Sequence, residues 1–220
     1  MGIYARQKLF FEAAYRTGEH GWPVDKPTRF IQKKVAAWAR RGKRWRVLDI
    51  GCGEGRHTFL FARHGFETVG LDYHFLAVER ALAIGRGTGR PNARAKFVVG
   101  DVFALPFPDV SFDVIVDYGC FHHVVRADTG RYLNAVLSRL KNGGHFFLSC
   151  FSTKFKHYPG ERRTRKFVVH RGHYDRFFEK RDFDALFGKD FDILDVVEEK
   201  DGLSVFFHLL MKKKDARSHA

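Results

Sequence analysis

Cysteine, methionine and proline are all scarce in this sequence, whose 220 residues include three, two and six of them, respectively. The three cysteines are scattered and form no Cys-x-x-Cys pair, so we expect no disulfide framework and a reducing, cytoplasmic setting. No apolar run approaches the roughly 18 residues that a membrane-spanning helix needs. The first residues also lack the basic-then-apolar pattern of a signal peptide. These absences argue against secreted, membrane-spanning and disulfide-stapled proteins.

Acidic residues are also few: 25 of them face 39 lysines and arginines, which leaves a formal net charge of +14. Such a charge attracts polyanions and can support binding to nucleic acid. It can equally keep the protein soluble or form a basic rim around a site for an anionic small molecule. The basic residues concentrate in residues 33–46 and 154–181. Charge alone does not decide between these roles.

Strand-like and helix-like segments alternate through the middle of the chain. Apolar and β-branched runs predict strands over residues 46–50, 66–71, 96–100, 112–116 and 145–151. Helical spacing predicts helices over residues 57–64, 75–84 and 131–140, the last of them ended by Asn142-Gly143-Gly144. This alternation indicates right-handed βαβ units and a mostly parallel sheet covered by helices on both faces.

The two ends of the chain follow other patterns. Residues 28–40 are predicted to form a helix, with Asp25 or Thr28 near its cap. Residues 154–178 are basic, aromatic and irregular, and residues 182–187 predict a short helix. The last two predicted strands, residues 191–197 and 203–211, are joined by a turn at residues 200–202. Strands joined so closely must be antiparallel, which predicts a C-terminal hairpin at one end of the sheet.

A glycine-rich turn follows the first strand of the alternating region: Asp49-Ile50-Gly51-Cys52-Gly53-Glu54-Gly55. A strand, a glycine turn and the start of a helix together form a nucleotide site at the carboxyl edge of a sheet. The third glycine comes two residues after the second, unlike the dinucleotide-binding Gly-x-Gly-x-x-Gly, and the Lys-Ser/Thr ending of a phosphate-binding loop is missing. The acid before the loop instead suits a ligand with an ammonium or sulfonium group.

An acid followed by Gly-x-Gly-x-Gly resembles the first motif of class I S-adenosylmethionine-dependent methyltransferases. Asp72 and Asp101 come at the ends of the second and third strands, where that family has acids. Residues 112–117 match its fourth motif, and Leu140-Lys141-Asn142-Gly143-Gly144 resembles its Leu-Lys-Pro-Gly-Gly, with Asn in place of Pro. The resemblance covers roughly residues 47–151. It implies an α/β fold, a single three-layer Rossmann-like domain of about seven strands, and S-adenosyl-L-methionine as the cofactor.

The expected domain covers residues 1–220 and has five parts along the chain. They are an N-terminal helical cap (1–45), a cofactor-binding core (46–151), a basic acceptor-side insert (152–181), a C-terminal helix and hairpin (182–211) and a frayed tail (212–220).

The resemblance also implies roles for the acids. In the family, the acid at the position of Asp72 accepts hydrogen bonds from both ribose hydroxyls, and the acid at the position of Asp101 accepts one from the adenine amino group. Asp49 either helps to hold the methionine end of the cofactor or bonds loop amides, and both interpretations stay open. The other cofactor-binding candidates lie beside these acids or in the turn: Gly51, Cys52, Gly53, Tyr73, Val102 and Asp117.

Residues that choose the methyl acceptor are expected after the fourth strand, in residues 117–123. This segment lacks the Asn/Asp-Pro-Pro-aromatic signature of methylases that modify exocyclic adenine nitrogens or glutamine amides. His122 or His123 could serve as a base, because imidazole titrates near pH ~6.5. Adjacent residues on a helix cannot both face one site, so only one of them is expected to act. Cys120 and the two histidines do not have a zinc-ligand spacing, so no metal is expected.

Two further segments are candidate walls of an acceptor pocket. The basic segment contains His173 and Tyr174, which complete the catalytic candidates; the alternative is a solvated basic loop. The stretch around Trp22 resembles the Trp-containing N-terminal segment of thiopurine- and tellurite-type methyltransferases, which folds over the cofactor. We expect residues 22–29, 118–123 and 158–178 to converge above the carboxyl ends of the strands.

The leading hypothesis is therefore an S-adenosylmethionine-dependent methyltransferase with a small-molecule acceptor and no membrane partner. Methylation of RNA or protein is the alternative, motivated by the basic surface, and nucleic acid is the corresponding second partner. The third hypothesis is a non-catalytic cofactor-binding subunit, against which the intact acids Asp49, Asp72 and Asp101 argue. The sequence does not indicate an oligomeric state.

Overall fold

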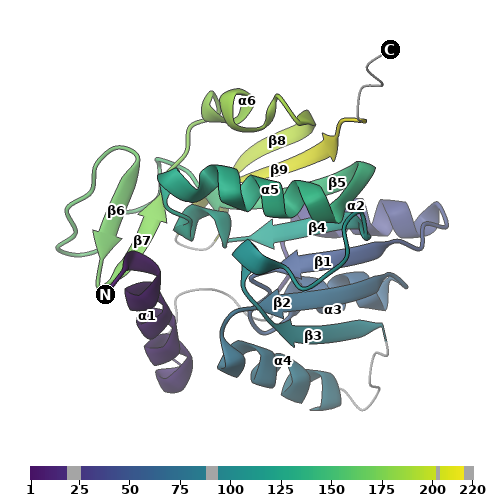
Figure 1. The fold of residues 1–220 in the computed structure, drawn as a ribbon, viewed down its shortest axis with the longest axis horizontal. Helices are drawn as coiled ribbons and strands as arrows, with labels where there is room; N and C mark the ends of the chain where they lie inside the picture. Colours follow the sequence, from purple (N-terminus) through teal and green to yellow (C-terminus); the bar gives the residue numbers. More distant parts are fainter. Residues whose placement is uncertain (19–25, 88–93, 202–203, 216–220) are drawn as a thin grey trace. The chain divides into compact units, whose positions relative to one another are not determined.

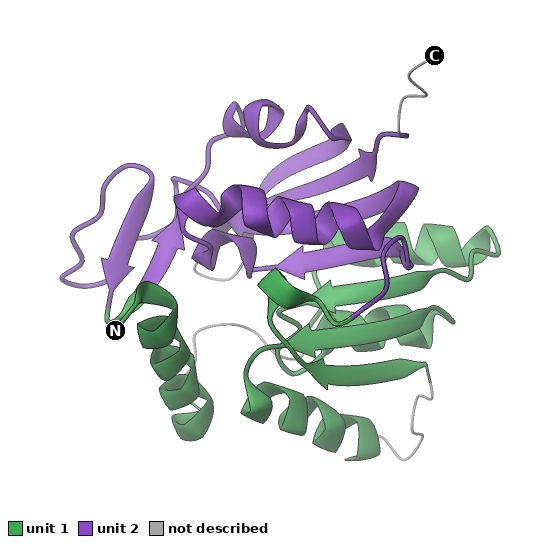
Figure 2. Cartoon of the chain, in the orientation of Figure 1, with its two compact units in different colours: residues 1–106, 171–173 green, residues 107–170, 174–220 purple. Residues whose placement is uncertain are grey.

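The computed structural model describes residues 1–18, 26–87, 94–201 and 204–215 (Figure 1). The chain divides into two compact units (Figure 2). The first unit is residues 1–106 with 171–173, and the second is residues 107–170 with 174–220. The predicted five-part division of a single domain stays a prediction.

The first unit is built from three parallel strands with connecting helices, as the alternating pattern predicts. The strands are β1 (Arg46–Ile50), β2 (Glu67–Asp72) and β3 (Ala95–Val99), and the helices are α3 (Arg56–Arg63) and α4 (Phe75–Gly87). β2 pairs with both β1 and β3. The backbone N–H of Gly100 donates to the carbonyl oxygen of Asp72 at 2.9 Å. The chain leaving β3 therefore lies beside the end of β2.

Two helices precede this sheet in the first unit. α2 (Arg29–Arg40) confirms the predicted helix, and Thr28 occupies its N-cap position; Asp25 lies outside the described residues. α1 (Ile3–Thr17) was not predicted. Its buried residues, Gln7, Ala14 and Tyr15, recur at helical spacing, but a polar glutamine interrupts the apolar pattern.

The second unit has four strands in the main sheet order and ends in the predicted hairpin. Its strands are β4 (Phe112–Tyr118), β5 (Leu140–Phe151), β8 (Phe191–Asp201) and β9 (Ser204–Lys213), and its α-helices are α5 (Thr129–Arg139) and α6 (Asp182–Phe187). β4 and β5 are parallel, whereas β9 is antiparallel to both β5 and β8. Hydrogen bonding orders the seven strands β3-β2-β1-β4-β5-β9-β8. The predicted α/β class, mostly parallel with an antiparallel C-terminal hairpin, is confirmed.

The sequence predicts that Asn142-Gly143-Gly144 ends a helix, but the structure places these residues elsewhere. α5 ends at Arg139, and Asn142-Gly143-Gly144 lies inside β5. The pairing of β5 with β4 changes register here, and Gly143 has a φ of 69°. A glycine adopts this left-handed conformation without steric cost, so the pair accommodates an irregularity in the strand.

Residues 154–178, predicted to be irregular, contain two short strands. They include β6 (Phe167–His170) and β7 (His173–Arg176), which form a separate two-stranded sheet. Arg171 and Gly172 join the strands and have φ values of 49° and 87°. Two consecutive left-handed residues are typical of the tight turn of a two-residue hairpin. Each strand has only four residues, too few to show a clear alternating pattern.

Candidate functional site

The glycine turn after β1 has a backbone that few other residues could adopt. Gly53 and Gly55 have φ values of 54° and 85°. A Cβ at position 53 would lie 3.3 Å from the hydroxyl oxygen of Tyr15, and one at position 55 would lie 2.7 Å from the ring of Phe97. Both left-handed backbone and close neighbours therefore require glycine. With little side chain in the way, a ligand can approach the backbone of this turn closely. A nucleotide site needs such a close approach.

Asp72, at the carboxyl end of β2, is held against this turn. Its carboxylate accepts hydrogen bonds from the backbone N–H of Gly53 at 3.0 Å and of His74 at 2.9 Å. The side chain is buried, and burial raises the pKa of Asp72 to about 6, against the lowering effect of these hydrogen bonds. A carboxylate has acceptor capacity for about four hydrogen bonds, so it can accept more donors than the turn supplies.

The other acids of the predicted cofactor site differ in their surroundings. Asp101 is exposed, and its carboxylate accepts from the backbone N–H of Phe103 at 2.8 Å, capping the 3-10 turn that begins at Val102. Asp49 is buried and accepts from both the backbone N–H and the hydroxyl of Thr58, at 2.9 and 2.7 Å. These bonds tie β1 to the first turn of α3, which supports the structural interpretation of Asp49.

The remaining cofactor-binding candidates in the first unit have supporting roles in the turn. The backbone N–H of Cys52 donates to the carbonyl oxygen of Leu71 at 3.0 Å. Its thiol is buried, and burial raises the pKa of Cys52. Gly51 is left-handed, with a φ of 64°, and Tyr73 is half-buried beside the acid of β2.

Two aromatic residues of helix α1 pack beside the candidate cofactor site, and they were not predicted from the sequence. The ring of Tyr15 stacks on the imidazole of His74 with centroids 5.2 Å apart, and Phe11 contacts Tyr73 edge-on at 6.3 Å. Burial raises the pKa of Tyr15, and the nearby charge of Asp72 raises it further. The helical spacing of the apolar residues in α1 is the signal that could have revealed it.

Asp117, predicted to bind cofactor, holds the chain after β4. It is fully buried, and one carboxylate oxygen accepts from the backbone N–H groups of Cys120 and Phe121, at 2.8 and 3.2 Å. The other accepts from the hydroxyl of Tyr132 at 2.5 Å. Burial raises the pKa of Asp117 to about 6. These three bonds fix the 3-10 turn η2 (Phe121–His123) that carries both histidines.

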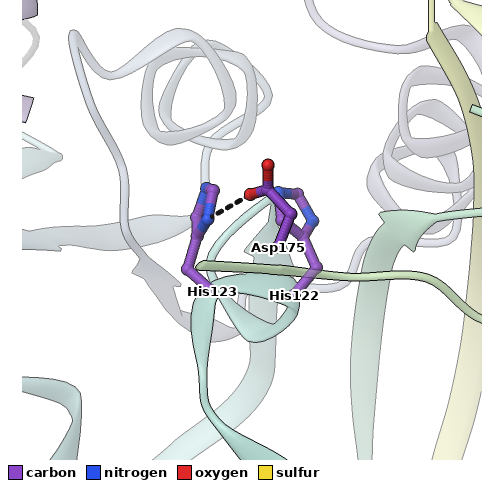
Figure 3. A group of neighbouring side chains, drawn as sticks. All are labelled: His122, His123 and Asp175. Carbon is purple, nitrogen blue, oxygen red and sulfur yellow. Dashed lines mark ion pairs between the residues drawn. The ribbon is translucent and has the colours of Figure 1, made fainter. Parts of the chain in front are cut away.

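His122 and His123 lie together beside Asp175 of β7 (Figure 3). Each of the three residues offers one polar atom, and all these atoms lie within 4.8 Å of one another. Both histidines lie on one 3-10 turn, and the expectation that only one of them acts stays a prediction. Asp175 was missed, and only the fold brings it to the histidines.

The two histidines have different contacts. Nδ1 of His123 lies 2.9 Å from Oδ1 of Asp175 and 3.1 Å from the carbonyl oxygen of Tyr174. The ring of His122 is buried and stacks on Phe151, with centroids 3.7 Å apart. The imidazole of His123 thus has polar neighbours and is partly exposed, whereas the ring of His122 is buried against an aromatic ring.

The other two catalytic candidates are largely buried. In the first unit, His173 stacks on Phe10 of α1 with centroids 4.0 Å apart. In the second unit, the ring of Tyr174 stacks on Phe167 at 5.6 Å. Of the three segments predicted to converge, residues 118–123 and 158–178 meet in the second unit through His123 and Asp175. Trp22 and its neighbours as far as residue 25 lie outside the described residues.

A family model described as a methyltransferase domain matches residues 47–144. Residues 47–144 are therefore similar to a methyltransferase domain. The match begins in β1 and ends in β5, so the matched region includes the glycine turn, Asp72, Asp101 and η2.

Curated relatives match the methyltransferase domain but not the whole chain. An uncharacterized methyltransferase, YcgJ, of Bacillus subtilis is 37% identical over 103 residues, which are 47% of this chain and 39% of that protein. The 2-methyl-6-phytyl-1,4-hydroquinone methyltransferase of Synechocystis is 35% identical over 99 residues, 44% of this chain and 29% of that protein. The chain thus spans less than half of the length of these two relatives.

A solved structure has the same fold over nearly the whole chain. It is the 1,6-didemethyltoxoflavin-N1-methyltransferase of Burkholderia thailandensis, with bound 1,6-didemethyltoxoflavin and S-adenosylhomocysteine. The TM-score is 0.77 at 23% identity, covering 96% of this chain and 89% of that one. This likeness confirms the predicted Rossmann-like fold of the methyltransferase domain and of the residues that follow it.

Much of the basic charge in residues 154–181 stabilises the second unit itself. The guanidinium of Arg163 donates to the carbonyl oxygens of Phe155 and Lys156, at 3.0 and 3.1 Å, and lies 4.1 Å from the centre of the Phe177 ring. Arg176 is buried and donates to the hydroxyl of Thr129 at 2.9 Å. These arginines are therefore not simply part of a solvated basic loop.

Among the described residues, no helix combines the length and apolar character needed to cross a membrane.

Proposed function

We propose that this protein is an S-adenosylmethionine-dependent methyltransferase that transfers a methyl group to a small-molecule acceptor. The observation that carries the proposal is Asp72, a buried carboxylate at the end of β2 that also binds the glycine turn. A buried carboxylate beside bare backbone, both within the first unit, supports the assignment of Asp72 as the acceptor for ribose hydroxyls. Asp101, after β3, is the second acid of the proposal and would accept a hydrogen bond from the adenine amino group.

The residues of the first unit fit this cofactor chemically. S-adenosylmethionine supplies a methyl group activated by a positively charged sulfur, and it leaves as S-adenosylhomocysteine. Asp72 would accept the two ribose hydroxyls with its remaining acceptor capacity, as charge-assisted hydrogen bonds. The left-handed glycines Gly51 and Gly53 would let the ligand approach the backbone.

Two observations support a small molecule as the acceptor. One similar protein is named as a 2-methyl-6-phytyl-1,4-hydroquinone methyltransferase and another, similar in fold, as a 1,6-didemethyltoxoflavin-N1-methyltransferase, and both names give a small molecule as the acceptor. In addition, Arg163 and Arg176 of the basic segment are engaged in contacts within the second unit. Fewer cations of that segment are then available to a polyanion. The charge of +14 keeps RNA and protein as the alternative acceptors to be tested.

Cofactor binding is tested by calorimetry with S-adenosylhomocysteine. We expect the wild-type protein to bind it and Asp72→Asn to bind it at least tenfold more weakly, because the ribose loses charge-assisted acceptors. Glu67→Gln is the matched control, since Glu67 begins the same strand but is exposed at its other end. Equal affinities of wild type and Asp72→Asn, with both proteins folded by circular dichroism, would refute the ribose assignment.

The acceptor class is tested with S-adenosylmethionine that carries a radiolabelled methyl group. The wild-type protein is incubated separately with a metabolite extract, total RNA and total protein. The proposal expects label in the small-molecule fraction, and less label when Asp72→Asn is used at a cofactor concentration below its dissociation constant. Label found solely in RNA or solely in protein would exclude the small-molecule acceptor.

A further inference from the structure

We propose that His122, His123 and Asp175 form a binding site for one divalent transition-metal ion of the zinc and iron class. All three residues belong to the second unit, so the inference does not depend on the candidate cofactor site of the first unit. It goes beyond the proposed function, because its ligand is neither the cofactor nor the methyl acceptor.

The fold brings the three side chains together from two parts of the second unit. His122 and His123 lie on η2, after β4, and Asp175 lies on β7. Each offers one donor atom, these atoms lie within 4.8 Å of one another, and Figure 3 shows the carboxylate beside both imidazoles. The spacing of Cys120 and the two histidines in the sequence predicts no zinc site, since the third ligand comes from a distant strand.

The donor atoms select the class of ion. Imidazole nitrogens and a carboxylate oxygen are ordinary ligands of zinc, and two histidines with one carboxylate also bind iron(II). Mg²⁺ and Ca²⁺ instead prefer sites built from oxygen atoms. Three protein ligands leave at least one coordination position open, so a water molecule or another small ligand would complete the site.

The separations of the donor atoms suit bonds to one ion. Nδ1 of His123 lies 2.9 Å from Oδ1 of Asp175. Ligand atoms bound to one Zn²⁺ at about 2.1 Å lie roughly 3.0–3.7 Å apart, so this pair needs little movement and the whole cluster has to close by roughly 1 Å at most. Ligands bind in their deprotonated form, so the ion displaces the hydrogen between Nδ1 and Oδ1, which leaves to solvent as a proton.

Hydrogen bonds hold both sides of the cluster in place. The carboxylate of Asp117 accepts from the backbone N–H groups of Cys120 and Phe121 and so fixes the turn that carries the histidines. On the other side, the hydroxyl of Tyr158 donates a hydrogen bond to Asp175. Hydrogen bonds of this kind orient metal ligands, and their loss typically lowers metal affinity about 10–100-fold.

The cluster is sheltered from water but has one accessible member. The side chain of His123 is 18% exposed, whereas that of Asp175 is 0% exposed. The ring of His122 is buried and stacks on Phe151 with centroids 3.7 Å apart. An ion would therefore enter past His123, and its attraction to the buried carboxylate would be screened less than at the surface.

The first test is calorimetry with Zn²⁺ on protein stripped of metal by a chelator, in the absence of cofactor and acceptor. The proposal expects one Zn²⁺ per chain. His123→Gln and Asp175→Asn should each bind it at least about a hundredfold more weakly, because each loses a ligand. His157→Gln and Asp184→Asn, exposed residues of the same unit, are the matched controls and should bind it like wild type. Equal affinities of wild type and Asp175→Asn would assign the zinc to other histidines and overturn the proposal.

The second test is X-ray absorption spectroscopy of the zinc-loaded wild-type protein. It counts the imidazole ligands without any substitution, so it decides even where a variant fails to fold. The proposal expects two imidazoles with oxygen atoms as the remaining ligands. A single imidazole, or a sulfur ligand, would overturn it. Neither experiment involves S-adenosylmethionine, so failure of the metal site leaves the proposed function standing, and failure of the proposed function leaves the metal site standing.

Discussion

At the scale of single residues, the proposed role of the buried Asp72 predicts that cofactor binding depends on pH. Burial raises its pKa to about 6, so it is mostly ionised at pH 7 and mostly protonated at pH 5. Protonation removes acceptor capacity, so affinity for a ligand that donates two hydroxyls falls as the pH is lowered. Calorimetry between pH 7 and pH 5 should show S-adenosylhomocysteine binding about tenfold more weakly at the lower pH.

The pH effect is attributed by substitution. In Asp72→Asn the dissociation constant should be weak at both pH values and change little between them, since asparagine does not titrate. A tenfold pH effect that persists in this variant would assign the titration to another group.

Asp49 has a second residue-scale test, which separates its two interpretations. Thr58→Val keeps the size of the side chain but removes the hydroxyl that donates to Asp49 at 2.7 Å in a buried environment. The loss of this hydrogen bond should lower the free energy of unfolding by about 1–3 kcal/mol, measured by urea denaturation. Thr58→Ser, which retains the hydroxyl, is the control and should lose less.

The binding data decide the role of Asp49. If it is structural, Thr58→Val and Asp49→Asn destabilise the protein while the affinity for S-adenosylhomocysteine per folded molecule stays near wild type. A selective loss of affinity in Asp49→Asn, with unchanged stability, would instead support a contact with the methionine end of the cofactor.

At the scale of elements, helix α1 is tied to the glycine turn by one buried ring. Tyr15 is 4% exposed, stacks on His74 and has its hydroxyl beside Gly53. Tyr15→Ala should therefore cost about 3 kcal/mol of unfolding free energy and weaken S-adenosylhomocysteine binding. Leu9→Ala on the same helix is the control, because Leu9 is exposed and its loss should change stability by less than about 0.5 kcal/mol.

The β6–β7 hairpin shows how an element can bring a carboxylate to two histidines without a sequence signature. Its turn, Arg171-Gly172, reverses the chain, and β7 then presents Asp175 to the 3-10 turn after β4. Arg163 and Arg176 stabilise its surroundings through carbonyl and hydroxyl acceptors. Charges in this segment thus serve the fold as well as the surface.

At the scale of the whole molecule, the charge of +14 predicts weak, non-specific binding to polyanions. Fluorescence anisotropy with a labelled single-stranded RNA should detect binding at 50 mM salt that is largely lost at 200 mM, because released counterions drive it. An excess of unlabelled RNA should leave methyl transfer to the small-molecule fraction unchanged at 200 mM salt. Competitive inhibition by RNA under these conditions would favour RNA as the acceptor.

The sequence by itself determined the strands β1 to β4, the glycine turn and the acids Asp72 and Asp101. These are local features: hydrophobic periodicity, the need for left-handed glycine and the position of an acid at a strand end all lie within a few consecutive residues. The candidate cofactor site could be predicted for the same reason, since the carboxyl ends of parallel strands meet at one edge. His123 was found as a candidate because it follows β4 directly.

The tertiary structure alone decided the partners of those residues. Asp175 reaches His123, and Tyr15 reaches the glycine turn, across 52 and 38 positions of chain, respectively, as their residue numbers show. The sequence holds no local record of such pairings, because they depend on which surfaces of separate elements are buried together. Burial also decided the charge states that matter, raising the pKa values of Asp72 and Asp117 to about 6, since only the folded chain removes these carboxyls from water.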